Sequence, residues 1–365
     1  MTTSPLPVEI VGGGLAGLSL GLALRRAGVP ITLCEAGEYP RHRVCGEFIA
    51  GLAPTTIARL GLGPLLAGAL RHREVAWFTR PASGPARVQR LPSPALGLSR
   101  HALDARLAAA FVAAGGELRT RTRVTDPAPQ PGRVFATGRR RGRSPWLGLK
   151  IHVHGLALAR DLELHLGDQA YVGLARVEDG AVNVCGLFRR RELGDCRAGS
   201  PNPAAAGFTP DRRGSATPPY NLLPAYLRAT GLDGLAARLA AARPDPGSFC
   251  AVAALSFDRR MPAADRVSLG DACAMIPPFT GNGMAMAFQS AEIALDPLLA
   301  YASGRQSWPD ACAEIHAGLR RRFHRRLASA GALHPFLLHP FPQRLLTALS
   351  RARLLPLRPL YAALH

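Results

Sequence analysis

Three glycines and one acidic residue near the N-terminus have the types and the spacing that suit the binding of a nucleotide. Gly12, Gly14 and Gly17 follow a short apolar segment at G-x-G-x-x-G spacing, and Glu35 closes a second apolar segment. The first glycine of such a turn allows a tight bend, the second allows a pyrophosphate to approach, and the third lets the following helix pack closely. A carboxylate at the position of Glu35 can accept hydrogen bonds from both hydroxyls of a ribose.

The segments around these residues predict a complete β-α-β unit over residues 8–35. A buried strand is expected from Val8 to Val11, a helix rich in alanine and leucine up to Gly28, and a second strand from Ile31 to Cys34. The helix begins where the phosphates would lie, so its free N–H groups face the anion. A glycine-rich turn without a ligand is the alternative. The carboxylate of Glu35 would repel a 2′-phosphate, which favours FAD or NAD over NADP.

Composition limits the class of protein. The chain has 365 residues, 47% of them hydrophobic, and a formal net charge of +20. A net positive charge of this size usually suggests that the partner is nucleic acid or an anionic membrane. Lys150 is, however, the only lysine, while arginine, alanine, glycine and proline abound, as a GC-rich genome would produce. We therefore interpret much of the charge as codon usage and do not expect a nucleic-acid partner.

The cysteines and the N-terminus indicate the compartment. The seven cysteines are scattered, without a C-x-x-C pair or metal-ligand spacing, which predicts a reducing environment. The opening MTTSPLP lacks the basic start of a signal peptide, and no run of about 18 apolar residues occurs. These features predict a cytoplasmic protein without a membrane span.

The C-terminal residues 308–365 allow two interpretations. They contain RRRFHRRL and then repeated leucine, phenylalanine and proline with interspersed arginines. A basic amphipathic helix of this kind can make peripheral contact with the inner face of a membrane. The alternative is a helical cap packed on the nucleotide domain.

A second glycine-led helix is expected late in the chain. The strand VSLG, residues 267–270, leads directly to Asp271, and Gly281 and Gly283 precede a long apolar helix. The N-terminus of that helix would point at a group that accepts hydrogen bonds. Asp271 is interpreted as a ligand-holding carboxylate, with a helix-capping aspartate as the alternative.

Alternating apolar and polar residues predict an antiparallel sheet over residues 150–189, with a hairpin turn at 178–180. This sheet is expected to form a wall over the site. His152 and His154 lie on one face of its first strand and could bind a metal, but no third ligand at suitable spacing accompanies them. A polar, substrate-facing surface is therefore favoured, and no metal site is predicted.

Other elements follow from local patterns. A helix is expected from Arg100 to the glycines after Ala114. The other predictions are a strand at 133–138, short strands at 74–80 and 87–91, a surface loop at 193–219 and a helix at 220–242.

Three separated blocks together resemble a known family. They are GGGLAG with Glu35; CGE at 45–47 with SRHALDARL around Arg100 and ATGR at 136–139; and GDACAMIPPFTGNGMAMA from residue 270. In this order, over most of residues 8–300, they resemble the FAD-dependent oxidoreductases related to geranylgeranyl reductase and to the aromatic-hydroxylase type of flavin monooxygenase. The resemblance is specific for FAD over NAD.

The resemblance implies a fold and its domains. The fold would be α/β, with a Rossmann-like, GR2-type FAD-binding domain, an inserted antiparallel sheet and a C-terminal helical region. The FAD domain would comprise residues 1–70, 95–150 and 255–305. The substrate domain would comprise 71–94 and 151–254, and the helical cap 306–365.

The resemblance also implies cofactor contacts. Contacts with the FAD, including its phosphates, ribose and ribityl chain, are implied for five residues: Ala16, Glu35, Arg100, Val124 and Asp271. Cys45 and Gly46 would lie beside the cofactor, and Gly283 and Met284 would place N–H groups near the flavin N1 and C2 carbonyl. A helix N-terminus there stabilises the anionic reduced flavin. The FAD is expected to be non-covalent. If NAD(P)H is the reductant, it would bind transiently, because a second glycine motif is missing.

The sequence departs from the family on the wall strand. Tyr171 matches the first residue of the Y-x-W-x-F-P motif of archaeal lipid reductases, but Gly173 and Ala175 replace its tryptophan and phenylalanine. This departure argues against a long isoprenoid substrate.

The predicted function is an FAD-dependent oxidoreductase that acts on a hydrophobic small molecule. A monooxygenase or halogenase acting on an aromatic or polyketide substrate is the first alternative, and a non-catalytic FAD-binding assembly protein is the second. Cys45 is the catalytic candidate, because Arg41 and Arg43 would favour its thiolate. It would either donate a proton after hydride transfer or shape the cavity.

Overall fold

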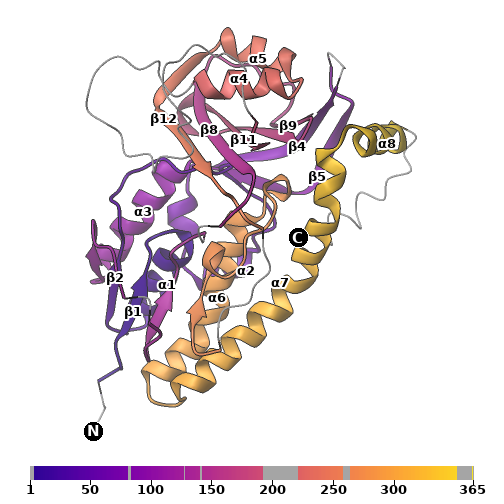
Figure 1. Cartoon of the computed structure of the whole chain (residues 1–365). Coiled ribbons are helices and arrows are strands. Elements are labelled where there is room, and N and C mark those ends of the chain that lie inside the picture. Colours follow the sequence, from indigo (N-terminus) through magenta and orange to yellow (C-terminus); the bar gives the residue numbers. More distant parts are fainter. Residues whose placement is uncertain are drawn as a thin grey trace.

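Two sheets, linked by helices, organise the computed structural model (Figure 1). The described residues are 4–80, 84–126, 128–139, 142–191, 221–257, 264–351 and 364. The sequence-predicted loop at 193–219 lies outside them.

The first sheet is the nucleotide-type layer, with five parallel strands in the order β13-β7-β1-β2-β6. Its strands are β1 (Val8–Val11), β2 (Ile31–Cys34), β6 (Glu117–Arg119), β7 (Arg133–Phe135) and β13 (Val267–Ser268). The helices α1 (Leu15–Arg26), α3 (Arg100–Ala113) and α6 (Gly283–Ala302) pack together beside it. Their apolar faces are fully buried, as at Leu18, Phe111 and Phe288, so one hydrophobic core holds the glycine turn in place.

The second sheet has eight strands in the order β12-β8-β11-β10-β9-β4-β5-β3. They are β3 (Phe48–Ile49), β4 (Leu70–Thr79), β5 (Arg87–Gly97), β8 (Trp146–His154), β9 (Leu162–Gly167), β10 (Ala170–Arg176), β11 (Val182–Arg189) and β12 (Arg243–Ala253). Most pairs are antiparallel as predicted, but β4 and β9 pair in parallel, so the sheet is mixed.

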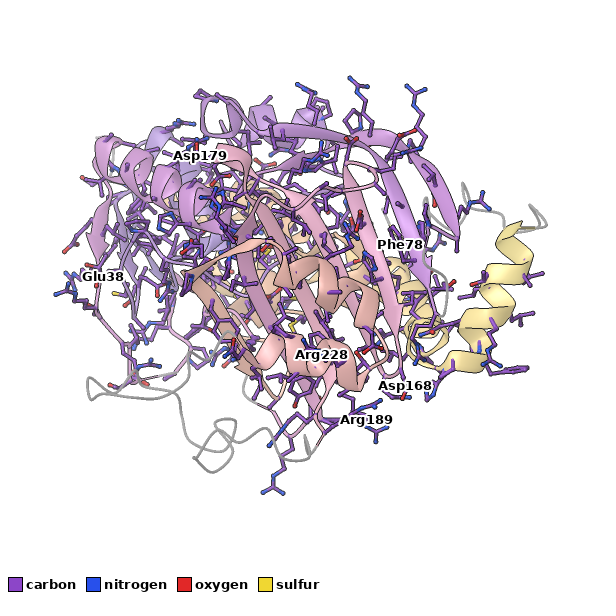
Figure 2. The ribbon with its side chains drawn as sticks, turned by 90° about the horizontal axis from the view of Figure 1, so that it is seen from above. Glu38, Phe78, Asp168, Asp179, Arg189 and Arg228 are labelled. Atoms are coloured by element: carbon purple, nitrogen blue, oxygen red, sulfur yellow. The ribbon has the colours of Figure 1, made fainter. Side chains whose placement is uncertain are left out.

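Alternation along the strands gives this second sheet two different faces. On β8, Leu149 and Ile151 join a core with the short helices α4 (Leu222–Ala229) and α5 (Asp233–Ala240), which cover the sheet in Figure 2. Lys150 and His152 necessarily point to the opposite face, toward the parallel sheet. That opposite face carries the residues of the candidate site.

Helices complete the chain. The small helix α2 (Pro54–Arg59) contacts α6, and α7 (Trp308–Leu338) runs along α6 and reaches the second sheet (Figure 1). The last helix, α8 (Pro340–Arg351), packs against the end of α7 and contacts β4. In the described part of the chain, none of these helices is both long and apolar enough to cross a membrane.

Several predicted elements differ from the observed ones. The single helix expected at 220–242 is two helices, because Gly231 adopts a left-handed conformation with φ of 73° just after α4. The strands expected at 74–80 and 87–91 extend to Leu70–Thr79 and Arg87–Gly97, where pairing rather than local pattern sets their length. Strand β8 begins at Trp146, before the start expected at residue 150.

A buried ion pair in the second sheet makes acid stability testable. Glu163 accepts hydrogen bonds from His165 and Arg238 at 2.8 Å each. Burial alone would raise the pKa of Glu163, but these two partners lower it to about 2. Because the pKa is lowered, the ion pair stabilises the fold at pH values above the usual carboxyl pKa. This stabilisation is lost as the pH falls toward 2.

The free energy of unfolding of the wild type should fall between about pH 5 and pH 2. We expect this fall to be smaller in Glu163→Gln by roughly 2–3 kcal/mol. Urea melts across this range would measure it. Glu74→Gln, at an exposed glutamate on β4, is the matched control and should retain the wild-type slope. Equal slopes for Glu163→Gln and the wild type would contradict the assignment.

Candidate functional site

The glycine turn between β1 and α1 has the geometry expected of a pyrophosphate cradle. A Cβ atom on Gly12 would lie 2.3 Å from the Ala136 carbonyl oxygen, and one on Gly17 would lie 2.0 Å from the Gly12 oxygen. A Cβ on Gly14 would meet only the Arg100 guanidinium, at 3.9 Å. The first and third glycines therefore permit close packing, while the second leaves open space at the start of α1, as predicted.

Glu35 lies directly against this turn. Its carboxylate accepts hydrogen bonds from the N–H groups of Gly13 at 2.8 Å and Gly37 at 2.9 Å, and from Arg41 at 2.6 Å. Burial opposes ionisation, but these hydrogen bonds and the charges of Arg41 and Arg43 lower the pKa of Glu35. The carboxylate is therefore ionised and held at the end of β2, directly beside the glycine turn.

Arginines surround the cradle, and the sequence analysis assigned only Arg100 of them to the cofactor. Arg100 forms a bidentate pair with the buried Asp104, at 2.8 Å for both contacts, and Arg43 donates to the same carboxylate at 2.9 Å. Arg41 Nε and Arg43 Nη2 are buried without a hydrogen-bond partner. Buried unsatisfied donors are costly, so their position beside the turn fits an anionic ligand.

Asp271 and Ala16 lie on the side of the turn that faces α6. A Cβ on Gly270 would contact the Ala16 side chain at 3.2 Å, so the strand end before Asp271 packs on the first turn of α1. Solvent reaches the Asp271 side chain, and the charges of Arg100, Arg139 and Arg43 act on it. Asp271 lies inside a 3-10 turn whose N-cap position is Leu269, so it does not occupy the cap position of that turn.

Val124 lies in the segment after β6 and is partly exposed. Two residues before it, the backbone N–H of Thr122 donates to the Glu35 carbonyl at 2.9 Å.

The segment Cys45–Phe48 connects the cradle with the start of α6. The Cys45 carbonyl accepts a hydrogen bond from Asn183 at 2.9 Å, and the Phe48 ring fills the space where a Cβ on Gly281 would lie. Burial raises the pKa of the Cys45 thiol, which is therefore protonated at neutral pH. The predicted thiolate is wrong, because Arg41 and Arg43 are paired with Glu35 and Asp104 instead.

The N-terminus of α6 is open for hydrogen bonding. Asn282 occupies the N-cap position without a side-chain cap hydrogen bond, and Gly283 and Met284 form the first turn without an acidic residue. The Asn282 amide donates instead to the Leu364 carbonyl. The first N–H groups of α6 are thus not satisfied by a side-chain cap.

The wall strand contributes an aromatic surface that the sequence predicted only in part. Tyr171 is buried, and its hydroxyl lies 3.4 Å from Nε2 of His334 on α7. Burial lowers the pKa of His334 to about 4, so the ring is neutral. Phe279 stacks on His334, and Trp146 and Phe257 contact it from other sides. His334 was missed because it lies far along the chain on a helix without a motif.

Gly173 opens this wall. It lies between Tyr171 and Ala175 on the same face of β10, and a Cβ there would meet only the Cys185 carbonyl oxygen, at 3.9 Å. The glycine at this position therefore leaves space next to Tyr171.

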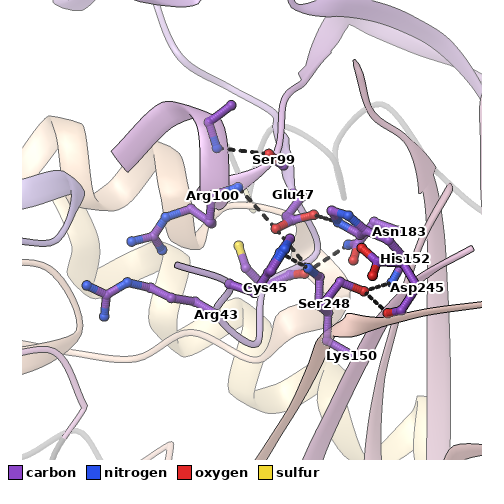
Figure 3. Close-up of polar contacts among 12 residues, drawn as sticks. Arg43, Cys45, Glu47, Ser99, Arg100, Lys150, His152, Asn183, Asp245 and Ser248 are labelled. Carbon is purple, nitrogen blue, oxygen red and sulfur yellow. Dashed lines mark hydrogen bonds and ion pairs between the residues drawn. The ribbon is translucent and has the colours of Figure 1, made fainter. Parts of the chain in front are cut away.

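The two wall histidines have different surroundings. His154 is partly exposed at the end of β8, opposite Arg243. His152 is buried and bonds to Glu47 at 2.5 Å (Figure 3). Burial and the charge of Lys150 lower the pKa of nearby His42 to about 4. His152 thus belongs to a polar cluster with Glu47 and His42, rather than to an open substrate-facing surface.

Sequence comparisons relate parts of the chain to quinone-reducing enzymes. It resembles the menaquinone reductase of Mycolicibacterium smegmatis, with 26% identity over 33% of this chain and 30% of that protein. It also resembles the menaquinone reductase of Mycobacterium tuberculosis, with 35% identity over 18% of this chain and 16% of that protein. The matched segment thus spans at most about a third of these relatives. No protein-family model matches the chain.

Solved structures share the whole fold. p-Nitrophenol 4-monooxygenase PnpA of Pseudomonas putida has a TM-score of 0.70 at 15% identity, covering 98% of this chain and 96% of its own. The flavin-dependent brominase Bmp2 has a TM-score of 0.69 at 16% identity, covering 98% and 93%. A geranylgeranyl bacteriochlorophyll reductase-like protein of Thermoplasma acidophilum has a TM-score of 0.66 at 15% identity, covering 91% and 87%. The predicted fold class and its resemblance to these families are confirmed at the level of the fold.

Proposed function

We propose that the protein is an FAD-dependent oxidoreductase that reduces a hydrophobic ring compound, such as a quinone. The observation that carries this proposal is the arrangement of two uncapped helix N-termini, on α1 and α6, on the same side of an aromatic sheet surface. A dinucleotide with a reactive ring requires this combination of a phosphate site, a site for ring charge and an apolar wall.

The residues present fit FAD. Gly14 leaves room for a pyrophosphate, Arg41 and Arg43 offer unsatisfied donors, and Glu35 offers an ionised acceptor for the ribose. Gly283 and Met284 would place N–H groups at the flavin N1 and C2 carbonyl. Bound FAD would supply hydride transfer, and the chain would supply orientation and charge stabilisation. NAD(P)H would serve as a transient reductant.

The apolar wall argues for the class of substrate. Tyr171, Leu187 and neutral His334 are buried and uncharged, and Gly173 leaves space for a ring. The menaquinone reductases similar to parts of this chain support a quinone. The domain assignment made from the sequence enters this proposal with one change, because β3, residues 95–97 of β5 and residues 146–150 of β8 belong to the second sheet. The substrate would lie between the FAD domain and this sheet.

The experiment that tests this function is anaerobic reduction of the FAD-loaded protein, followed by addition of a soluble naphthoquinone such as menadione. Reoxidation of the flavin by the quinone without oxygen is expected. Oxygen consumption in step with product would instead support a monooxygenase or halogenase. Firm FAD binding without reduction by NADH, NADPH, ferredoxin or dithionite-reduced mediators would support an assembly protein.

We expect Glu35→Arg to weaken FAD binding at least about tenfold, because each lost charge-assisted hydrogen bond contributes roughly 1.5–3 kcal/mol. Fluorescence titration of the apo-protein with FAD measures the affinity. Glu38→Arg, at the exposed glutamate three positions further along, is the matched control and should bind FAD normally. Unchanged affinity in Glu35→Arg would overturn the ribose assignment.

We expect Cys45→Ser to retain FAD and the fold while slowing product formation. A protonated thiol beside the cofactor can donate a proton after hydride transfer or shape the cavity, and a serine hydroxyl is a weaker acid. Single-turnover reoxidation by menadione compares the two proteins. Loss of FAD, or normal turnover, would remove Cys45 from the catalytic residues.

The end of the helical cap supports a peripheral membrane contact. α7 packs on the core through Ile315, Leu319 and Phe323, as a cap does. Near the end of α7 and on α8, Phe336, Phe341 and Leu345 are exposed large hydrophobic residues, and Phe341 is 78% exposed. Figure 2 shows α8 at the edge of the molecule. An apolar projection on a basic protein suits an anionic membrane face on the cytoplasmic side.

We expect the wild type to float with phosphatidylglycerol-containing vesicles at moderate salt and Phe341→Ser/Leu345→Ser to remain unbound. Phosphatidylcholine vesicles test the contribution of charge. Val112→Ser, at an exposed apolar residue of α3, is the matched control and should float normally. Absence of wild-type binding would leave α7 and α8 as a cap alone.

A further inference from the structure

The only lysine of the chain lies in the centre of the second sheet. Lys150 is one of 45 basic residues and is 0% exposed. It lies on the face that points toward the parallel sheet, and its register neighbours on the flanking strands are Cys185 and Cys250. Lysine is among the residues least often buried, so its ammonium requires specific partners.

The partners of Lys150 come from the segment that carries Cys45. Its Nζ atom lies 3.0 Å from Nδ1 of His42 and 3.4 Å from Oε1 of Glu47 (Figure 3). Glu47 also accepts the backbone N–H of Arg100 at 3.0 Å and bonds to His152 at 2.5 Å. The ammonium therefore joins strand β8 to both ends of the segment His42–Glu47.

The same side chains form a recognisable set of cation ligands. The donor atoms of His42, Glu47 and His152 all lie within 4.8 Å of one another, and no other such group occurs in the described part of the chain. Two imidazoles and a carboxylate are the ligands that zinc uses in many enzymes. Here, however, an ammonium already contacts two of the three residues and supplies the positive charge.

We propose that Lys150 is a built-in cation that positions the segment His42–Glu47, and with it Cys45, in place of a metal ion. An ammonium is compact and can direct its donors to His42 and Glu47 together, whereas a planar guanidinium presents its donors in a fixed fork. This requirement explains why lysine occurs here in a chain that otherwise uses arginine. The link from Cys45 to turnover rests on the proposed function, but the positioning itself does not.

Metal binding gives a direct test that does not involve the flavin. Lys150→Ala removes the ammonium and leaves His42, Glu47 and His152, so it should bind one Co²⁺, seen as visible d–d absorption. The wild type should bind none at this cluster, and Lys150→Ala/His42→Ala should lose the site. Stoichiometric Co²⁺ in the wild type that is lost in His42→Ala would overturn the proposal, as would absence of binding in a folded Lys150→Ala protein.

The reactivity of Cys45 measures the positioning. We expect Lys150→Ala to raise the rate of Cys45 modification by Ellman's reagent about 10- to 100-fold, the size of effect found when a residue that supports a metal ligand is removed. Saturating Co²⁺ should restore protection. Lys150→Arg should resemble Lys150→Ala. Adding Cys45→Ser to each protein shows which part of the modification signal comes from Cys45. Arg243→Ala, at an exposed basic residue of the adjacent strand β12, is the matched control. An unchanged Cys45 rate in Lys150→Ala would overturn the proposal.

A measurement on the unaltered protein covers the case in which the variants do not fold. Labelling with ¹⁵N-lysine gives a single side-chain signal, because Lys150 is the only lysine. A buried, hydrogen-bonded ammonium exchanges its protons slowly, so a resolved NH₃⁺ signal is expected that His42→Ala shifts. A rapidly exchanging signal typical of an exposed lysine would overturn the proposal. Failure of flavin reduction by any donor would overturn the proposed function and leave these three results intact.

Discussion

The buried carboxylate of Glu47 is the contact on which the two layers of the molecule depend. It accepts the first N–H of α3 from the nucleotide-type layer and binds His152 and Lys150 of the second sheet. Taking a carboxylate out of water costs several kcal/mol unless its partners are well placed. The position of each layer is therefore coupled to the other, because moving either one would leave a buried charge unpaired.

This coupling determines what lies between the layers. The residues just before Glu47 pass the glycine turn, and Phe48 just after it packs on Gly281 at the start of α6. One short segment thus sets the distance between the phosphate end and the ring end of the proposed FAD site. A cofactor that bridges two domains requires such a fixed spacing, and a contact made only by apolar packing would allow the sheets to slide.

The sequence predicted the parts of the site that depend on local pattern. The strand, glycines, helix and acid of residues 8–35 occur as expected, because each glycine has its steric reason within a few residues. The strands of the second sheet were found from alternation, although their lengths were not, because pairing partners decide where a strand ends.

Contacts between distant residues could not be predicted in the same way. His42 and Lys150 are 108 positions apart, and Tyr171 and His334 are 163 positions apart. Metal-ligand spacing along the chain therefore could not reveal the neighbours of His152, because they come from a loop in the other layer. The Cys45 thiolate was predicted wrongly because sequence proximity to Arg41 and Arg43 does not show that other carboxylates already hold those charges.

Different positions on the inner face of the second sheet have different surroundings. Across one row Lys150, Cys185 and Gly173 are neighbours, and across the next Gly148, Leu187 and Tyr171 are neighbours. The β8 end of the first row is filled by a charged cluster that satisfies itself, whereas the β10 end is left open by Gly173. An apolar ring would therefore bind at the β10 side, where no charge must be desolvated. The polar side would hold the loop that the ring must approach, so the same strands would both contact the ring and fix the residues beside it.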